Sequence, residues 1–184
     1  RNAAGQLSEP TMVTIEVLQA KQMDSDLVAL WRFDGTWSDY SGNNNHLTPY
    51  SPNIDGPVFT ADAKIGSNAA SFDGVNDYAE AATPSSTLII GTQSWAISAW
   101  IKTSYTGTAI MSILSSDPSV SPLYHLYLDE SGFATLLIRS DNNKLVRVTD
   151  DRDIRDGGWH HLAGILDRGN RVMKIYVDGQ ERDV

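Results

Sequence analysis

One stretch of the sequence, 159–179, constrains the fold of this chain more than any other. Two apolar-rich runs lie on either side of the turn-forming residues at 167–170, whose sequence is Asp-Arg-Gly-Asn. A second turn dipeptide, Asp178-Gly179, follows the second run directly. Two apolar runs joined by such residues are typical of a β-hairpin. The stretch therefore predicts a hairpin that leads at once into another tight turn.

The rest of the chain repeats this succession of short apolar runs and turn signals. No segment shows a convincing helical period of 3.6 residues. Strands recur about every ten residues, which is the pattern of an all-β sandwich. We expect them at 11–18, 27–33, 69–72, 78–81, 95–101, 110–114, 124–128, 133–139 and 144–149.

The strand expected at 95–101 differs from the others because it is apolar on both faces. Its odd-numbered residues lie on one face, and Ala96 and Trp100 lie on the other. Strands that are covered on both sides belong in the interior of a sheet. We therefore expect this segment to be a central strand.

Composition excludes two classes of partner. The net charge of −9 does not suit nucleic acid, because the phosphates would repel an acidic surface. No apolar run approaches the roughly 20 residues needed to cross a bilayer, so we expect no membrane insertion. The 184 residues, 41% of them apolar, suffice for one sandwich domain and a tail. Since the chain has no cysteine, its core must stabilise it without disulfides.

We divide the chain into three parts. Residues 1–18 end in the alternating run 11–18 and resemble the final strand of a bacterial immunoglobulin-like or cadherin-like domain. The alternative is that this run is an extra strand of the main domain. The polar stretch 19–26 is typical of a linker, and 27–184 form the main domain. Because residues 1–5 lack the features of a signal peptide, we interpret the chain as an internal segment of a longer polypeptide.

Four motifs of the main domain occur in an order and spacing that resemble a known family. They are 27–34 with the loop 39–45, then 69–78, then 95–102, and finally the hairpin 159–179. The set resembles the bacterial type of laminin G-like jelly-roll domain, within the concanavalin A-like lectin/glucanase superfamily. The resemblance implies a two-sheet antiparallel jelly-roll β-sandwich in a secreted or cell-surface protein. Because members of the family continue with two more strands after the hairpin, we expect 27–184 to lack the final strands.

The loop 39–45 is the candidate metal site. Calcium prefers oxygen ligands from carboxylates, amides and backbone carbonyls, and Asp39, Asn43 and Asn45 offer such groups within one short loop. The resemblance implies a structural calcium ion here, with Asp39 as the side-chain ligand and a second carboxylate from an absent final strand. The alternative is an ordinary loop whose Asp and Asn side chains cap their own turns.

Two aromatic residues of the turn-rich segment 34–45, Trp37 and Tyr40, are the candidate ligand-binding residues. Aromatic rings exposed on a loop can serve as platforms for a sugar, which makes this segment a candidate glycan site. The other tryptophans fall on apolar faces of expected strands, so we predict that they pack in the core. They are Trp31, Trp95, Trp100 and Trp159.

Further residues that could carry chemistry are interpreted as structural. His160 and His161 are neighbours on an expected strand, so their side chains point to opposite faces and cannot bind one metal ion together. The acidic stretch 73–77 is expected to form a turn. The stretch 150–153 is expected to form a solvated charged loop.

The superfamily includes glucanases, so catalysis must be weighed. Retaining glycoside hydrolases need two carboxylates about 5 to 5.5 Å apart, which in these enzymes come from the signature Glu-x-Asp-x-x-Glu on one strand. This chain has no such run, and we expect it not to be an enzyme. We predict a non-catalytic module that binds a glycan or an extracellular protein, next to other domains of the same polypeptide. The alternatives are a glycoside hydrolase-type catalytic domain and a purely structural spacer.

Overall fold

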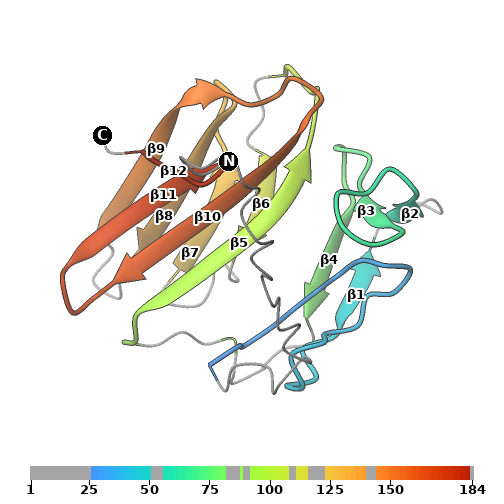
Figure 1. The fold of residues 1–184 in the computed structure, drawn as a ribbon, viewed down its shortest axis with the longest axis horizontal. Coiled ribbons are helices and arrows are strands. Elements are labelled where there is room, and N and C mark those ends of the chain that lie inside the picture. Colours follow the sequence, from blue (N-terminus) through green and yellow to red (C-terminus); the bar gives the residue numbers. More distant parts are fainter. Residues whose placement is uncertain are drawn as a thin grey trace, which may run out of the picture.

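The computed structural model describes residues 26–50, 56–81, 88, 92–107, 111–115, 123–139 and 144–182. Within these ranges the chain forms twelve β-strands (Figure 1). The strands are β1 (Leu47–Tyr50), β2 (Val58–Thr60), β3 (Ala69–Ser71), β4 (Tyr78–Ala81), β5 (Trp95–Lys102), β6 (Met111–Ser115), β7 (Leu123–Leu128), β8 (Phe133–Arg139), β9 (Leu145–Asp153), β10 (Trp159–Asp167), β11 (Val172–Val177) and β12 (Gln180–Arg182).

Two four-stranded antiparallel sheets form the body of the molecule. One has the order β12-β11-β10-β5 and the other the order β6-β7-β8-β9. Figure 1 shows the two sheets facing one another, while the two-stranded ribbons β1-β4 and β2-β3 lie beside them on the side of β5. The predicted hairpin is β10 and β11, and the predicted all-β, antiparallel sandwich is confirmed.

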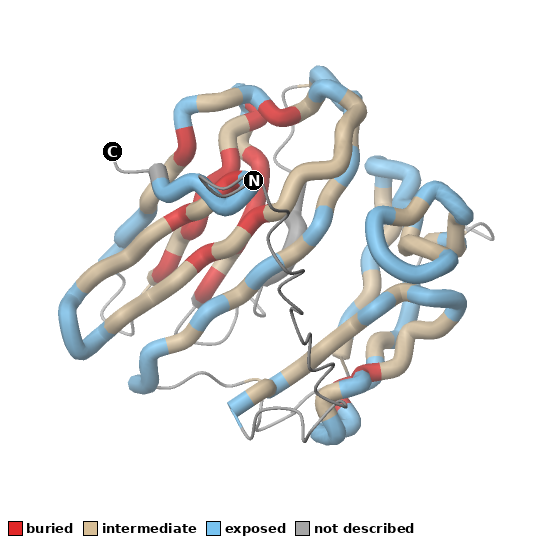
Figure 2. Tube along the Cα trace, viewed as in Figure 1, coloured by how far each residue is buried: buried red, intermediate tan, exposed pale blue. Residues whose placement is uncertain are grey.

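The core lies between the two four-stranded sheets, because alternate residues of each strand point inward. Figure 2 shows the buried residues gathered on the facing strands. The sheets come close where β10 crosses β8, since a Cβ atom on Gly164 would lie 3.0 Å from the methyl carbons of Leu136. The fully buried apolar side chains are contributed by both sheets: Leu126, Leu128, Leu136, Leu162, Ile175 and Val177.

The strand expected at 27–33 is the main error in the predicted elements. Apart from a single bridge between Trp31 and Asp39, this segment pairs with no strand in the described part of the chain. Its backbone carbonyls and amides instead bond to side chains of the loop 39–45. Apolar residues do alternate at 27–33. The backbone groups that a neighbouring strand would bind are instead bound by polar side chains of the loop 39–45.

The segment β5 also departs from expectation. Its inward residues are half-buried and pack against the core, as predicted, but among the described strands β5 stands at the end of its sheet. Its outward residues are exposed, and Trp100, predicted to be in the core, retains 38% of its surface. On this face Lys64 lies over the Trp100 ring, and Asp62 binds Lys102.

Several other elements shift relative to the expectation. β9 extends through 150–153, so the expected charged loop is the end of a strand, and Asp150 there is buried. The short strands β1, β2 and β12 were not expected, because prolines and turn residues mask them in the sequence. The segments 1–18 and 19–25, assigned to a preceding domain and a linker, lie outside the described residues.

The packing between the sheets predicts a large difference between two leucines. Leu162→Ala, at a fully buried position, should lower the free energy of unfolding by about 2–5 kcal/mol, because it leaves a cavity between the sheets. Leu145→Ala makes the same chemical change at a position that is 63% exposed and should alter stability by less than about 0.5 kcal/mol. Urea unfolding monitored by tryptophan fluorescence measures both. Equal losses for the two variants would contradict the assignment of the core.

Candidate functional site

The carboxylate of Asp39 organises the loop in which the candidate metal ligands lie. Its Oδ1 accepts hydrogen bonds from the backbone N–H groups of Leu30 and Ser41, both at 2.8 Å. Its Oδ2 accepts from the Ser41 hydroxyl at 2.7 Å and from the Asn45 N–H at 3.0 Å. Burial alone would raise the pKa of Asp39, but these bonds outweigh it and lower the pKa. The stabilisation is therefore present above the unfolded pKa and is lost as pH falls through the folded pKa.

The two asparagines of the loop bind the segment before it. The Asn43 amide nitrogen donates to the carbonyls of Leu27 and Val28, at 2.8 and 3.1 Å. The Asn45 amide nitrogen donates to Val28 at 2.8 Å, and the Asn45 carbonyl accepts the indole N–H of Trp31 at 2.7 Å. Asn45 is 3% exposed and Asp39 8%, so their side chains lie inside the protein, whereas Asn43 and its bonds are exposed. Through these hydrogen bonds the loop 39–45 fixes the position of the segment that begins at Leu27.

In this arrangement protein donors surround the predicted calcium ligands, and the calcium site stays a prediction. A carboxylate offers about four lone-pair positions, and protein donors already occupy four on Asp39. The amide nitrogen atoms of Asn43 and Asn45 donate to backbone carbonyls, so these side chains also serve the fold of the loop. Among the residues that the structure describes, no three His, Cys, Asp or Glu side chains form a group suited to a metal ion. The turn-capping alternative accounts for the loop as it is arranged.

The two candidate aromatic residues have different surroundings. Trp37 is half-buried in an aromatic cluster, with ring centroids 5.0 Å from Phe59, 5.5 Å from Phe33 and 6.1 Å from Phe72. Tyr40 is exposed, and the guanidinium of Arg32 lies 4.8 Å from its ring centroid. The indole therefore packs between β2 and the segment after β3 and is not exposed as the prediction required. A binding role for Tyr40 stays a prediction.

The adjacent histidines point to opposite faces of β10, as their positions on a strand require. His160 Nδ1 lies 2.9 Å from an Asp178 carboxylate oxygen, and its Nε2 lies 3.0 Å from Asp156. His161 contacts the ring of Trp100 at 5.1 Å on the outer face. Burial alone would lower the pKa of His160, but the bonds to Asp178 and Asp156 outweigh it and raise the pKa. The protonated ring can donate to both carboxylates at once.

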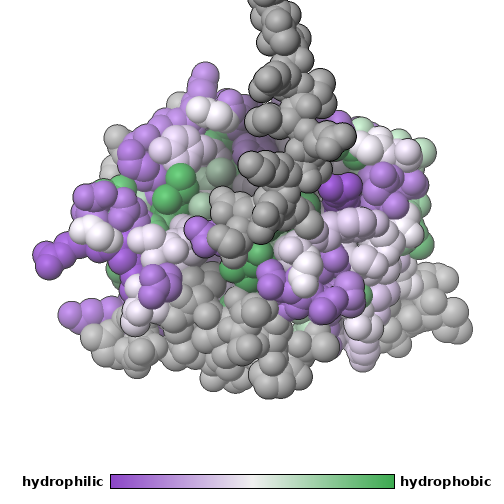
Figure 3. All heavy atoms as spheres, turned by 60° about the horizontal axis from the view of Figure 1, so that its bottom comes forward, coloured by the Kyte–Doolittle hydropathy of each residue, from purple (hydrophilic) through white to green (hydrophobic). Residues whose placement is uncertain are grey.

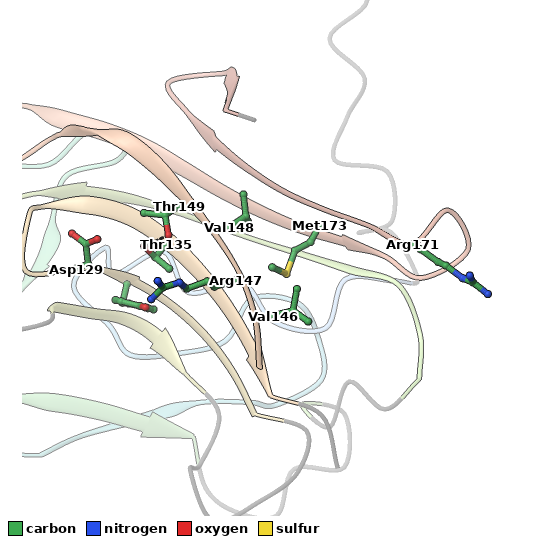
Figure 4. A pocket seen from close by; sticks show the side chains of 9 residues that line it. Asp129, Thr135, Val146, Arg147, Val148, Thr149, Arg171 and Met173 are labelled. Carbon is green, nitrogen blue, oxygen red and sulfur yellow. Dashed lines mark hydrogen bonds between the residues drawn. The ribbon is translucent and has the colours of Figure 1, made fainter. Parts of the chain in front are cut away.

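The structure has a hollow beside β9 that was not predicted from the sequence. Its cavity volume is about 590 Å³. Figure 4 shows that β9 divides its lining: Thr149 and Arg147 point to the side of Thr135 and Asp129, whereas Val148 and Val146 point to the side of Met173. This division follows from the strand, since successive side chains alternate. The lining residues are Tyr127, Asp129, Thr135, Val146, Arg147, Val148, Thr149, Arg171 and Met173.

The polar side of the hollow is a row across three strands. Register places Tyr127 of β7 opposite Thr135 of β8, and Thr135 opposite Thr149 of β9. The hydroxyls of Thr135 and Thr149 are hydrogen-bonded at 3.1 Å. Arg147 is exposed and points to the same side of the hollow as Thr135, while Tyr127 and Thr135 are buried. The sequence signal was the alternation of polar residues in β9, but only the register shows that Tyr127, Thr135 and Thr149 are neighbours across three strands.

Comparison with known proteins supports the fold. A family model described as the concanavalin A-like lectin/glucanases superfamily, of the laminin G type, matches residues 73–184. The chain belongs to this superfamily. No curated protein and no solved structure gives a significant match. In the described part of the chain, no helix has the length and apolar character needed to cross a membrane.

The match to the concanavalin A-like superfamily covers one part of the predicted domain. It includes β4 to β12, and therefore both four-stranded sheets and the hollow beside β9. The loop 39–45 lies before the matched residues. The family assignment thus applies to the sandwich.

The role of Asp39 can be tested by substitution. Asp39→Asn should lower the free energy of unfolding by about 1–3 kcal/mol, because an amide cannot accept four hydrogen bonds from these donors. The loss should be the same with added calcium and with a chelator. Asp151→Asn, at an exposed carboxylate on β9, is the control and should leave stability nearly unchanged. A melting temperature that rises with calcium in the wild type, but not in Asp39→Asn, would show that the loop holds the ion.

The contacts of His160 predict how stability depends on pH. Because the folded pKa is raised, the contribution of His160 is complete below the unfolded pKa and is lost as pH rises through the folded pKa. His160→Gln should therefore destabilise the protein more at pH 5.5, about one unit below the ordinary pKa of histidine, than at pH 9. His161→Gln, the same change on the opposite face, should leave this pH dependence in place. Urea unfolding at the two pH values checks it, and equal losses in His160→Gln would contradict it.

Proposed function

We propose that this chain is a non-catalytic carbohydrate-binding module of a secreted or cell-surface multidomain protein, and that the hollow beside β9 holds the sugar. The observation that carries the proposal is the cross-strand row of Tyr127, Thr135 and Thr149, which lines the hollow together with the exposed Arg147. The superfamily often binds carbohydrate, which agrees with this choice of ligand.

The chemistry of the hollow suits a polyhydroxylated ligand. A sugar presents hydroxyls that both donate and accept, and the hollow offers hydroxyls, the guanidinium of Arg147 and the Asp129 carboxylate. The ring of Tyr127 is buried under this side of the hollow, with its centroid 4.5 Å from that of the His125 ring. The volume of about 590 Å³ is shared between the two sides of β9. These residues lie on paired strands whose backbone is already ordered, so little conformational entropy is lost on binding.

The same lining argues for binding over hydrolysis. Glycosidases use a pair of carboxyl groups on either side of the scissile bond. Asp129 is the one carboxylate among the described residues that line the hollow. Its Oδ1 already accepts the N–H groups of Ser131 and Phe133, which shape the β7–β8 turn. This geometry supports a role in structure and hydrogen bonding without a catalytic partner.

The surface favours a glycan over a protein partner. In the described part of the face seen in Figure 3, apolar residues form small areas separated by hydrophilic ones. Tight protein interfaces need a contiguous buried centre, often with aromatic anchors. Sugars bind through hydrogen bonds and single rings, which a mixed surface provides.

Affinity electrophoresis through gels that contain laminarin, galactomannan, arabinoxylan or dextran tests the proposal. At least one neutral polysaccharide should retard the wild type, and Arg147→Ala should weaken that binding roughly tenfold, as expected for a lost charged hydrogen bond. Lys64→Ala is the control, because it removes an exposed cation near Trp100 on the other sheet.

Two results would contradict the proposal. If no polysaccharide retards the wild type, the chain acts as a spacer or binds a protein. If the purified chain releases reducing sugar, and Asp129→Asn abolishes the release, the domain is a hydrolase.

A further inference from the structure

We propose that Tyr50 and Tyr78 form a second sugar-binding surface, which takes the pyranose rings of a neutral glycan. These residues stand on the ribbon β1-β4, which Figure 1 shows on the side of β5, away from β8 and β9. The inference goes beyond the proposed function, since no residue of the hollow takes part. Either surface can fail its test without the other.

The two tyrosines are a cross-strand pair. Tyr50 is the register partner of Tyr78 in the antiparallel ribbon, so both side chains leave it on the same face. Their ring centroids are 4.7 Å apart with a tilt of 40°. The two rings thus pack against each other at a tilt on one face of the ribbon.

Both rings remain open to solvent. Tyr50 retains 48% of its surface and Tyr78 retains 44%. An aromatic cross-strand pair stabilises a ribbon, but this stabilisation does not require the rings to be exposed to solvent. Exposed aromatic area of this extent is what a pyranose ring needs, because its C–H groups pack against an aromatic face while its hydroxyls stay in water.

Polar groups flank the rings on the same face. The next cross-strand pair on that face is Thr48 with Glu80, and both residues are exposed. A threonine hydroxyl and a carboxylate can bond to sugar hydroxyls at the edge of a ring that lies on the tyrosines. Burial and the Glu80 carboxylate raise the pKa of Tyr78, so its hydroxyl stays protonated and can donate.

Charge selects the class of glycan. Glu80 lies on the same face as the two rings, and the whole chain carries a net charge of −9. Uronate or sulfate groups would be repelled by this carboxylate at close range. The ligand that fits is therefore an uncharged oligosaccharide or polysaccharide.

The test uses the full chain in three variants. Tyr50→Leu and Tyr78→Leu keep an apolar side chain but lose the aromatic face, and Tyr50→Phe keeps the ring. Affinity electrophoresis with laminarin, galactomannan, arabinoxylan and dextran measures binding, and polygalacturonate serves as the anionic probe. Each leucine variant should bind the preferred neutral polymer about threefold to tenfold more weakly, while Tyr50→Phe binds like the wild type.

Stability and assembly are measured on the same variants. Melting temperatures should stay within a few degrees of the wild type, because the replaced rings are exposed. Repeating the leucine substitutions in the Arg147→Ala background separates the two surfaces: the further loss of binding should persist there. Three results would overturn the proposal: unchanged binding in the leucine variants, stronger retardation by polygalacturonate, or a wild-type dimer in sedimentation that becomes a monomer in Tyr50→Leu. The last result would assign the pair to contacts between copies of the chain.

Discussion

The close approach of two sheets is the constraint on which the rest of this protein depends. Leu126 and Leu136 of one sheet and Leu162 and Ile175 of the other are fully buried between them. Gly164 lets β10 approach Leu136 without a side chain in between. Because every strand alternates, each inward leucine fixes the direction of its neighbours, which must face outward. The surfaces available for binding are thus set by the core.

The sequence predicted the elements whose determinants are local. The hairpins β7-β8 and β10-β11 were found because apolar runs and turn residues lie next to each other in the chain. The position of β5 was not found, because apolar residues on both faces do not reveal whether a neighbouring strand exists. The strand predicted at 27–33 was wrong for a related reason. Its backbone partners are side chains that come from 39–45, and no rule based on local pattern anticipates them.

The loop 39–45 shows why a polar cluster is ambiguous in a sequence. Asp39, Asn43 and Asn45 can point their oxygen atoms toward an ion, or they can serve as hydrogen-bonding partners for the backbone. The residue types are the same in both cases, and the outcome depends on which donors the fold brings near. In this structure the N–H groups of Leu30 and Asn45 donate hydrogen bonds to the Asp39 carboxylate. The cluster stabilises the chain before β1.

Binding on sheet faces has a physical advantage over binding on such a loop. Thr135 and Thr149 in one place, and Tyr50 and Tyr78 in another, are each held opposite one another by strand pairing. A ligand of the proposed surfaces would meet side chains whose backbone is already ordered, so less conformational entropy would be lost on binding. Weak contacts with single sugar rings can then add up along a chain that reaches more than one surface, because the second contact forms at high effective concentration. Modest individual affinities are sufficient for a module of this kind.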